Sequence, residues 1–232
     1  MMVVVQQIVF TNNPDGWHRL AEALGLIAPY PPSDVWSEFD GDGILAVHHA
    51  SEGYAPGRCD LTLIVDDLDA AATALASFSV ERGEMEGVCP MLTVTTGEGL
   101  SVIVAQGEAR PPQGDLAVEP IWFQRDIAEP RAILQALGFT TGIVADRGGW
   151  AQMRADGGAI GLHEGDPGIG ASFRADGDLD ALAERVREAG FEAAIIDEAY
   201  ARTLRIEDPD AGTEVWINGP NEDLYGYSDE SR

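Results

Sequence analysis

The sequence predicts an α+β protein built from four β-α-β-β-β units that form two similar pairs. Two internal similarities support this prediction. A hairpin-like stretch at 36–51 recurs at 150–165, and each copy contains a Trp, an Asp-Gly turn and a His near its end. The apolar segment 3–10 aligns without gaps with 116–123. Internal repetition on this scale indicates duplication and outweighs any single motif.

The first and third units each open with a strand and a helix. Residues 3–10 alternate and are rich in Val and Ile, which predicts a strand. Asn13 is expected to cap a helix that has Pro14 in its first turn and ends at Gly25. Asp126 is expected to cap the matching helix of the third unit.

The hairpins complete these two units. Asp156, Gly157 and Gly158 are expected to make the turn of the second hairpin, because glycine tolerates the positive φ that a tight hairpin turn needs. Residues two apart on a strand share a face of the sheet. Ile160 and Leu162 are therefore expected to pack beneath the helix, which leaves His163 facing the concave side of its unit.

The second and fourth units share a helix start. The second unit begins with the strand-like segment 59–65, and the tetrapeptide Asp-Leu-Asp-Ala at 67–70 recurs at 178–181. The first Asp of the earlier copy is expected to cap a short helix over 68–76. Each of these units should continue with three further strands, as the first and third do.

The composition of 109–115, which is rich in Pro and Gly, is typical of a linker. It predicts two halves followed by an acidic tail that we expect to fray. The expected boundaries are a first domain at 1–108 (units 3–50 and 59–107), a second domain at 116–221 (units 116–165 and 168–219), and a tail at 222–232.

The charge of the chain excludes some partners. Asp and Glu number 40 against 14 basic residues, all of them Arg, which gives a net charge of −26. Nucleic acids and anionic membranes both attract positive surfaces, so neither is an expected partner. Repulsion between like-charged copies also favours a monomer over a homodimer.

Cysteine content and hydropathy point to the cytoplasm. Cys59 and Cys89 are too few for a disulfide framework, which suits a reducing compartment. The N-terminus has no basic region or cleavage site typical of a signal peptide. No apolar run approaches the ~20 residues of a membrane span.

The order of these elements resembles the vicinal oxygen chelate superfamily, which includes glyoxalase I, extradiol dioxygenases and bleomycin-resistance-type binding proteins. The resemblance covers nearly the whole chain. Its best local signature is EDPDAGTEVWINGP at 207–220, which is similar to the family's Asp-Pro-Asp-Gly turn followed by a strand carrying Glu. The resemblance implies that pairs of units curl into two half-open barrels, each around a cavity.

The resemblance also implies metal ligands on the first and last strands of the units, where His and Glu can bind Zn, Fe, Mn or Ni. The last-strand Glu is matched by Glu214, whereas its counterpart in the second unit is about Val102. The first-strand His positions hold other residues in the four units, namely Gln6, Asp60, Glu119 and roughly Ala171. We therefore expect no metal centre of the usual kind. A divalent metal held by Glu119, His163 and Glu214 is the alternative.

Strand alternation places the candidate ligand site in the C-terminal pair. An aromatic wall with a few convergent polar groups is the usual construction of a small-molecule site. The expected ligand-binding residues are Glu119, Phe123, Trp150, Arg154, His163, Arg205, Glu214 and Trp216. The expected second cavity, in the N-terminal pair, has Gln6, Trp36, His48 and Asp60.

Each of these residues also has a purely structural interpretation. His163 could be a hydrogen-bonded core histidine, Arg205 and Glu214 could form an ion pair, and the tryptophans could fill the barrels. Glu119 is the hardest to explain in this way, because an inward carboxylate is costly unless it is paired or used.

Three functions follow, in order of preference. The first is a binding protein that takes an aromatic or polycyclic small molecule into a Trp-lined cavity. The second is a metal-dependent lyase or dioxygenase with the atypical ligands named above. The third is a structural or interaction module whose barrels are closed. The residues alone do not decide whether the protein is an enzyme.

Overall fold

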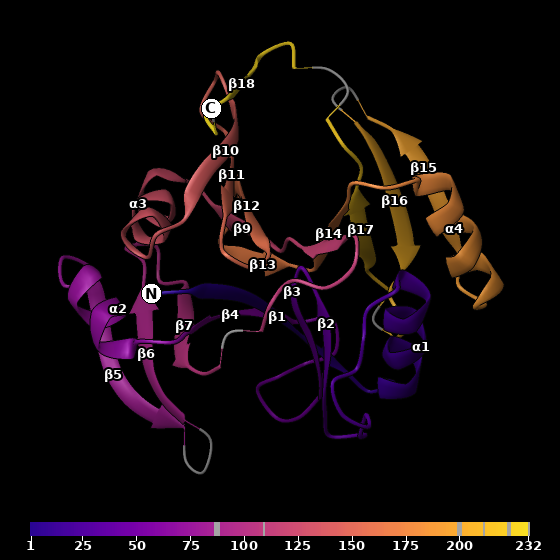
Figure 1. Cartoon of the computed structure of the whole chain (residues 1–232), viewed down its shortest axis with the longest axis horizontal. Coiled ribbons are helices and arrows are strands. Elements are labelled where there is room, and N and C mark those ends of the chain that lie inside the picture. Colours follow the sequence, from indigo (N-terminus) through magenta and orange to yellow (C-terminus); the bar gives the residue numbers. More distant parts are fainter. Residues whose placement is uncertain (86–88, 109, 199–200, 211, 222–223, 232) are drawn as a thin grey trace.

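The first half of the chain folds into one mixed seven-stranded sheet (Figure 1). The computed structural model describes residues 1–85, 89–108, 110–198, 201–210, 212–221 and 224–231. The strand order is β2-β3-β1-β4-β7-β6-β5, and the first strands of the two units, β1 and β4, run antiparallel at the centre. The elements of this half are β1 (Val3–Thr11), α1 (Pro14–Leu24), β2 (Trp36–Gly41), β3 (Gly43–His49), β4 (Cys59–Val65), α2 (Leu68–Ala74), β5 (Ser79–Met85), β6 (Cys89–Thr95) and β7 (Ser101–Gln106).

The first unit is one strand shorter than predicted. Between α1 and β2, where every residue is described, an isolated bridge between Ile27 and Asp40 stands in place of a strand. Pro29, Pro31 and Pro32 follow this bridge. Proline has no N–H to donate to a sheet, so the ladder cannot extend through this segment. The other three units have the predicted β-α-β-β-β order.

The second half forms two sheets that face each other (Figure 1). The six-stranded sheet has the order β13-β9-β12-β11-β10-β18, and the five-stranded sheet has the order β15-β16-β17-β14-β8. The elements are β8 (Leu116–Val118), β9 (Ile121–Gln124), α3 (Ala128–Ala136), β10 (Thr140–Ala145), β11 (Trp150–Arg154), β12 (Ala159–Glu164), β13 (Gly168–Gly170), β14 (Ser172–Ala175), α4 (Leu179–Glu188), β15 (Ala193–Asp197), β16 (Arg202–Glu207), β17 (Glu214–Asn218) and β18 (Tyr227–Asp229).

Two strands pass from one of these sheets to the other. β8 and β9 are separated by Glu119 and Pro120, and β13 and β14 are separated by Ala171. β8 pairs with β14 in the five-stranded sheet, whereas β9 pairs with β13 in the six-stranded sheet. Pro120 cannot donate a ladder hydrogen bond, which suits the position where the strand changes sheet. Glu119 is thereby placed where the two sheets meet.

The helices begin and end close to the predicted residues. The side chain of Asn13 accepts a hydrogen bond from Gly16 N, and Gly25 ends α1 with φ of 85°. Asp67 caps α2 through Ala70 N. The prediction for Asp126 was wrong by one residue, because Ile127 is the N-cap of α3. The Asp126 carboxylate still accepts from Ala128 N at 2.9 Å.

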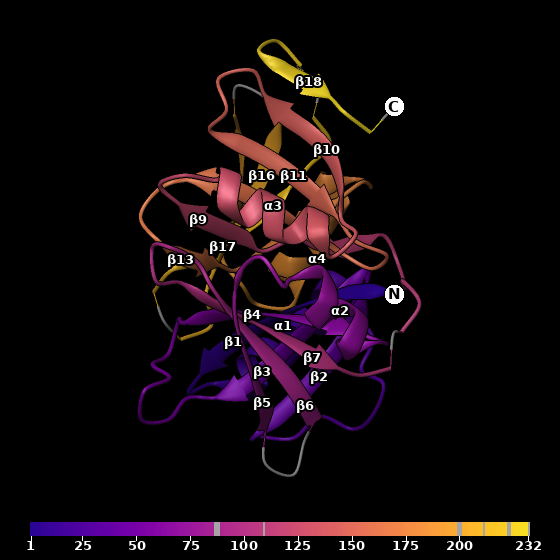
Figure 2. The same cartoon turned by 90° about the vertical axis from the view of Figure 1, so that its left-hand side faces the viewer.

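The helices of the second half cover the outer faces of its sheets, with α3 outside β10 and β11 and α4 outside β15 and β16 (Figures 1 and 2). Met153, Ile160 and Leu162 are fully buried in one cluster with Ile133 and Leu134 of α3. The alternate residues of these strands therefore face the space between the two sheets, as strand periodicity predicts.

The two halves are joined through their hairpin turns. Gly158 N, in the second half, donates to Asp42 Oδ1 at 2.7 Å. In the reverse direction, Val3 N of the first half donates to Asp156 Oδ2 at 2.8 Å. Ser172 N also donates to Gln7 Oε1 at 3.0 Å. In each direction the Asp of the hairpin turn accepts a backbone N–H of the other half, from Gly158 of a turn in one case and from Val3 of a first strand in the other.

The tail does not fray over its described part. Tyr227 and Asp229 bound β18, which pairs antiparallel with β10. Arg131 Nη2 lies 2.6 Å from Glu230 Oε2, and this ion pair fastens the strand to α3. The expectation of fraying was wrong because β10 offers an open sheet edge to the tail (Figure 2). Residues 222–223 and 232 lie outside the described residues.

The described part of the expected linker, 110–115, is packed along the first half. Gln113 N donates to Gly41 O at 2.8 Å, and Arg110 contacts carboxylates of β2. The division into domains at 1–108 and 116–221 stays a prediction. No helix within the described residues is long and apolar enough to cross a membrane.

Candidate functional site

A cavity of about 280 Å³ lies between the two sheets of the second half. The third unit lines it with Glu119, Ile121, Phe123, Trp150, Gln152 and His163. The fourth unit and the segment after it add Arg174, Trp216, Asn218, Asn221 and Tyr227. The cavity thus has four aromatic rings on four different strands and a carboxylate where the sheets meet.

His163 is held in a ring cluster at the end of β12. It pairs with Trp150 across β11 and β12, with ring centroids 6.1 Å apart, and its ring lies 5.5 Å from that of Phe123. His163 Nδ1 is 2.7 Å from the carbonyl oxygen of Glu164. Because a carbonyl only accepts, Nδ1 is the donor of this hydrogen bond.

Glu119 is the buried charge of the cavity, with 3% of its surface exposed. Gln152 Nε2 lies 3.1 Å from Glu119 Oε1 and 3.0 Å from Oε2. Gln152 Oε1 in turn accepts from Arg154 Nε at 3.0 Å. Burial raises the pKa of the Glu119 carboxyl, while Arg174 and the hydrogen bond from Gln152 act against the rise. Such a carboxylate can accept a hydrogen bond or a proton from a ligand.

The structure brings five of the eight expected ligand-binding residues to this cavity: Glu119, Phe123, Trp150, His163 and Trp216. Arg154 does not line it, and acts behind Gln152 through the hydrogen bond just described. Arg205 and Glu214 also lie outside the cavity lining. Arg205 lies opposite Trp216 on the neighbouring strand β16, and Glu214 is two residues before Trp216 on β17.

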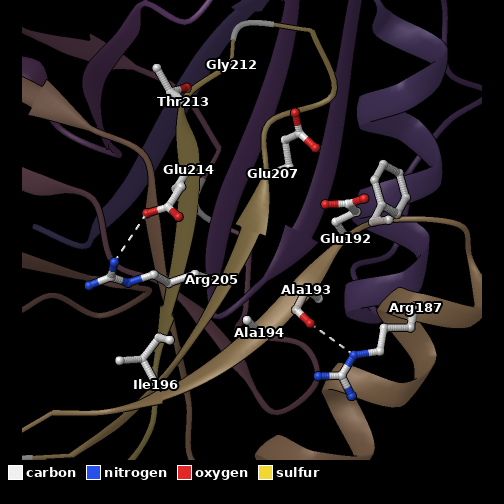
Figure 3. A pocket seen from close by; sticks show the side chains of 11 residues that line it. Arg187, Glu192, Ala193, Ala194, Ile196, Arg205, Glu207, Gly212, Thr213 and Glu214 are labelled. Carbon is white, nitrogen blue, oxygen red and sulfur yellow. Dashed lines mark hydrogen bonds and ion pairs between the residues drawn. The ribbon is translucent and has the colours of Figure 1, made fainter.

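Arg205 and Glu214 border a separate open hollow of about 720 Å³ beside the edge strand β15 (Figure 3). Arg205 Nη1 is 3.5 Å from Glu214 Oε2, and Arg205 Nη2 is 3.0 Å from Glu198 Oε1. The Arg205 guanidinium carbon also lies 4.7 Å from the centre of the Trp216 ring. The purely structural interpretation, an ion pair, therefore describes the contact between Arg205 and Glu214.

Several lining residues were missed by sequence reasoning. Asn218 lies two residues after Trp216 on β17, so strand alternation could have found it. Tyr227 could not have been found locally, because it reaches the cavity only through the pairing of β18 with β10.

The first half repeats the ring cluster. Trp36 pairs with His48 across β2 and β3, and His48 lies 5.2 Å from the Phe10 ring. His48 Nδ1 is 2.7 Å from the next carbonyl, as in the second half. The tryptophan and histidine of the expected second cavity thus have the same neighbours as their counterparts.

Each half has a hydrogen-bonded Gln–Glu pair, but the positions of the amide and the carboxylate are exchanged between the two halves. Gln6 Nε2 donates to Glu38 Oε1 at 3.0 Å, so the amide is on the first strand and the carboxylate on the hairpin. Glu38 also forms an ion pair with Arg110 at 2.5 Å. Asp60, the remaining residue of the expected second cavity, is paired with Arg58 at 2.7 Å.

The described side chains around the cavity do not form a set of metal ligands. Within the described part of the chain, no group of three or more His, Cys, Asp or Glu side chains is placed to hold a metal. Glu214 lies outside the cavity in an ion pair, and both oxygens of Glu119 accept from Gln152. The residues expected as alternative ligands, Glu119, His163 and Glu214, do not fit one metal site.

The repeated β-α-β-β-β units and their paired sheets define the vicinal oxygen chelate fold, as the resemblance implied. No family model matches the sequence, and no curated protein matches it. A catechol 2,3-dioxygenase is similar in structure, with a TM-score of 0.66, 15% identity and coverage of 100% of this chain and 97% of its own.

Two further solved structures share this fold. An Mn(II)-bound glyoxalase from Novosphingobium aromaticivorans has a TM-score of 0.64 and 14% identity, covering 94% of this chain and 81% of its own. The 2,2',3-trihydroxybiphenyl 1,2-dioxygenase from Sphingomonas wittichii has a TM-score of 0.61 and 11% identity, covering 94% and 89%. At such identities the likeness shows the fold alone.

Proposed function

We propose that the protein binds an aromatic small molecule in the cavity of its second half, without a metal centre of the usual kind. The observation that carries this proposal is the combination of Phe123, Trp150, Trp216 and Tyr227 with the buried carboxylate of Glu119 around one space. Small-molecule sites are built from apolar and aromatic walls with few polar groups. Aromatic rings also stack favourably on one another.

The size of the cavity limits the ligand. A volume of about 280 Å³ is near the lower end of the roughly 300–1,000 Å³ typical of ligand sites. It suits a compact ligand of one or two rings better than a large polycyclic one. A barrel closed by its own side chains would not leave this space, which favours binding over the purely structural alternative.

The enzymatic alternative is a metal-dependent lyase or dioxygenase. It is supported by the fold, since the similar structures include dioxygenases and a glyoxalase. The donor set described above argues against it. The other expected properties are part of the same proposal: a monomer in the cytoplasm, with a small molecule as partner and with neither nucleic acid nor membrane.

Tryptophan fluorescence tests the proposal directly, because Trp150 and Trp216 border the cavity. Naphthol and phenol should quench the emission saturably, and Trp216→Ala should weaken the binding of both. Trp36→Phe, in the first half, is the matched control and should leave binding unchanged. Elemental analysis of the same sample should find no stoichiometric metal. One metal per chain, or no saturable quenching by either ligand, would contradict the proposal.

A further inference from the structure

Glu119 and Glu38, the matching carboxylates of the two halves, differ in whether an arginine forms an ion pair with them. Both halves join an amide and a carboxylate across the first strand and the hairpin, as Gln6–Glu38 and Glu119–Gln152. In the first half, Arg110 completes the pair with an ion pair to Glu38 at 2.5 Å. Among the described residues, no arginine or histidine lies within ion-pair distance of Glu119.

Two arginines, Arg154 and Arg174, act on the charge of Glu119 from beyond ion-pair distance, and Arg174 lines the same cavity. Arg154 Nε donates to Gln152 Oε1 at 3.0 Å, and Arg174 Nε lies 3.1 Å from Asp176 Oδ1. The bond from Arg154 orients the Gln152 amide, so that its N–H group faces Glu119. An amide N–H only donates, and it is within reach of both Glu119 oxygens. This arrangement suits a carboxylate in its charged form.

The rings around the cavity add to this preference for positive charge. The face of an aromatic ring is negative, and a cation over it is attracted more strongly when water is excluded. Trp216 already has the Arg205 guanidinium 4.7 Å from its centre. Phe123, Trp150 and Tyr227 also line the cavity, so a ligand there meets aromatic rings on several sides.

We infer that the ligand is a compact aromatic cation, such as an aryl or benzyl ammonium, whose positive nitrogen is seated toward Glu119 between the rings. The ligand would supply the positive charge that Arg110 supplies to Glu38 in the first half. The net charge of −26 acts in the same direction, because it raises the local concentration of cations. This inference rests on the proposed function and names the ligand class of the same site.

A set of probes of nearly equal shape tests the inference. Phenyltrimethylammonium and tert-butylbenzene differ chiefly by a positive nitrogen in place of a carbon, and benzoate supplies a negative charge. Each is titrated at pH 8 and followed by tryptophan fluorescence and calorimetry. The cation should bind at least tenfold more tightly than tert-butylbenzene, and benzoate should bind most weakly.

Two variants then locate the effect. Glu119→Gln should reduce the preference for the cation at least tenfold while tert-butylbenzene still binds. Glu38→Gln removes the matching carboxylate of the first half and should leave the preference unchanged. The comparison on the unaltered protein remains decisive even where a variant folds poorly.

The outcomes separate the inference from the proposed function. If tert-butylbenzene and the cation bind within threefold of each other, or benzoate binds best, the inference is overturned and the aromatic site stands. If none of the three probes binds, both fail. A cation preference that survives in Glu119→Gln would also overturn the inference, because the charge would then be recognised elsewhere.

Discussion

Trp150 lies directly opposite His163 on β11 and β12, with the two ring centroids 6.1 Å apart. Trp36 and His48 hold the same relation in the first half at 5.7 Å. Because both halves contain this pair, it belongs to the repeated architecture and does not by itself mark a ligand site. The groups that distinguish the second half are the ring of Tyr227 and the carboxylate of Glu119, which forms no ion pair with any described arginine or histidine.

The stability of the protein should depend on pH through Glu119. Burial raises the pKa of this carboxyl in the folded state. Between the unfolded and folded pKa values the folded state binds more protons, so the free energy of unfolding falls as the pH rises. The contribution is largest below the unfolded pKa. Urea unfolding across pH should show this slope in the natural protein and lose it in Glu119→Gln. Parallel pH profiles for the two proteins would contradict the prediction.

Two tryptophans should respond oppositely to truncation. Trp216 is 37% exposed at the cavity, whereas Trp122 is fully buried beneath the sheet. Trp216→Ala should weaken binding of an aromatic ligand with little change in thermal midpoint. Trp122→Ala should lower the free energy of unfolding by about 3–5 kcal/mol. Calorimetry of unfolding and ligand titration on both variants check this. A loss of that size in Trp216→Ala would assign Trp216 to the core.

Tyr227 should contribute to affinity although it belongs to the tail. Its ring borders the cavity while its backbone pairs with β10. Tyr227→Ala should weaken binding by about 0.5–1.5 kcal/mol, the scale of one aromatic contact. Ser228→Ala, on the neighbouring residue of the same strand, is the control and should bind normally. Equal affinities for both variants would remove Tyr227 from the site.

The hairpin turn of the second half should tolerate no side chain at Gly158. Its φ is +81°, and an added Cβ would lie 2.9 Å from Val5 Cβ and 3.0 Å from Val118 O. Gly138 has a φ of +95° with nothing within 4 Å, so it isolates the backbone effect. Gly138→Ala should cost about 1–2 kcal/mol. Gly158→Ala should cost roughly 1–3 kcal/mol more through overpacking. Equal losses in urea unfolding would show that the turn can shift away from the added methyl group.

Much of the fold could be predicted because the chain repeats itself. The alignment of 3–10 with 116–123 identified the first strands, and alternation assigned Trp150, His163 and Trp216 to the concave face. The alternation of residues along a strand predicts on which face of the sheet a side chain lies, but it does not predict whether that part of the strand reaches the cavity. Arg205 and Glu214 therefore lie beyond the cavity, in the hollow beside β15.

Contacts between distant segments could not be predicted. The tail strand β18 and the ion pair of Arg110 with Glu38 join residues far apart in sequence. No local pattern specifies such partners. The missing strand of the first unit is different, because Pro29, Pro31 and Pro32 are local to it and their lack of N–H donors opposes a strand there.

The reciprocal contacts of Asp42 and Asp156 bear on the origin of the chain. Asp42 N donates to Leu116 O at 2.9 Å, and Asp156 N donates to Val3 O at 3.1 Å, where Val3 and Leu116 are matching residues of the two aligned first strands. Two separate copies of such a half could make both contacts at once about a twofold axis, as an isologous homodimer does. A homodimer must carry two identical cavities. Within one chain the two halves need not be identical, and here Glu38 is paired with Arg110 whereas Glu119 lines a cavity.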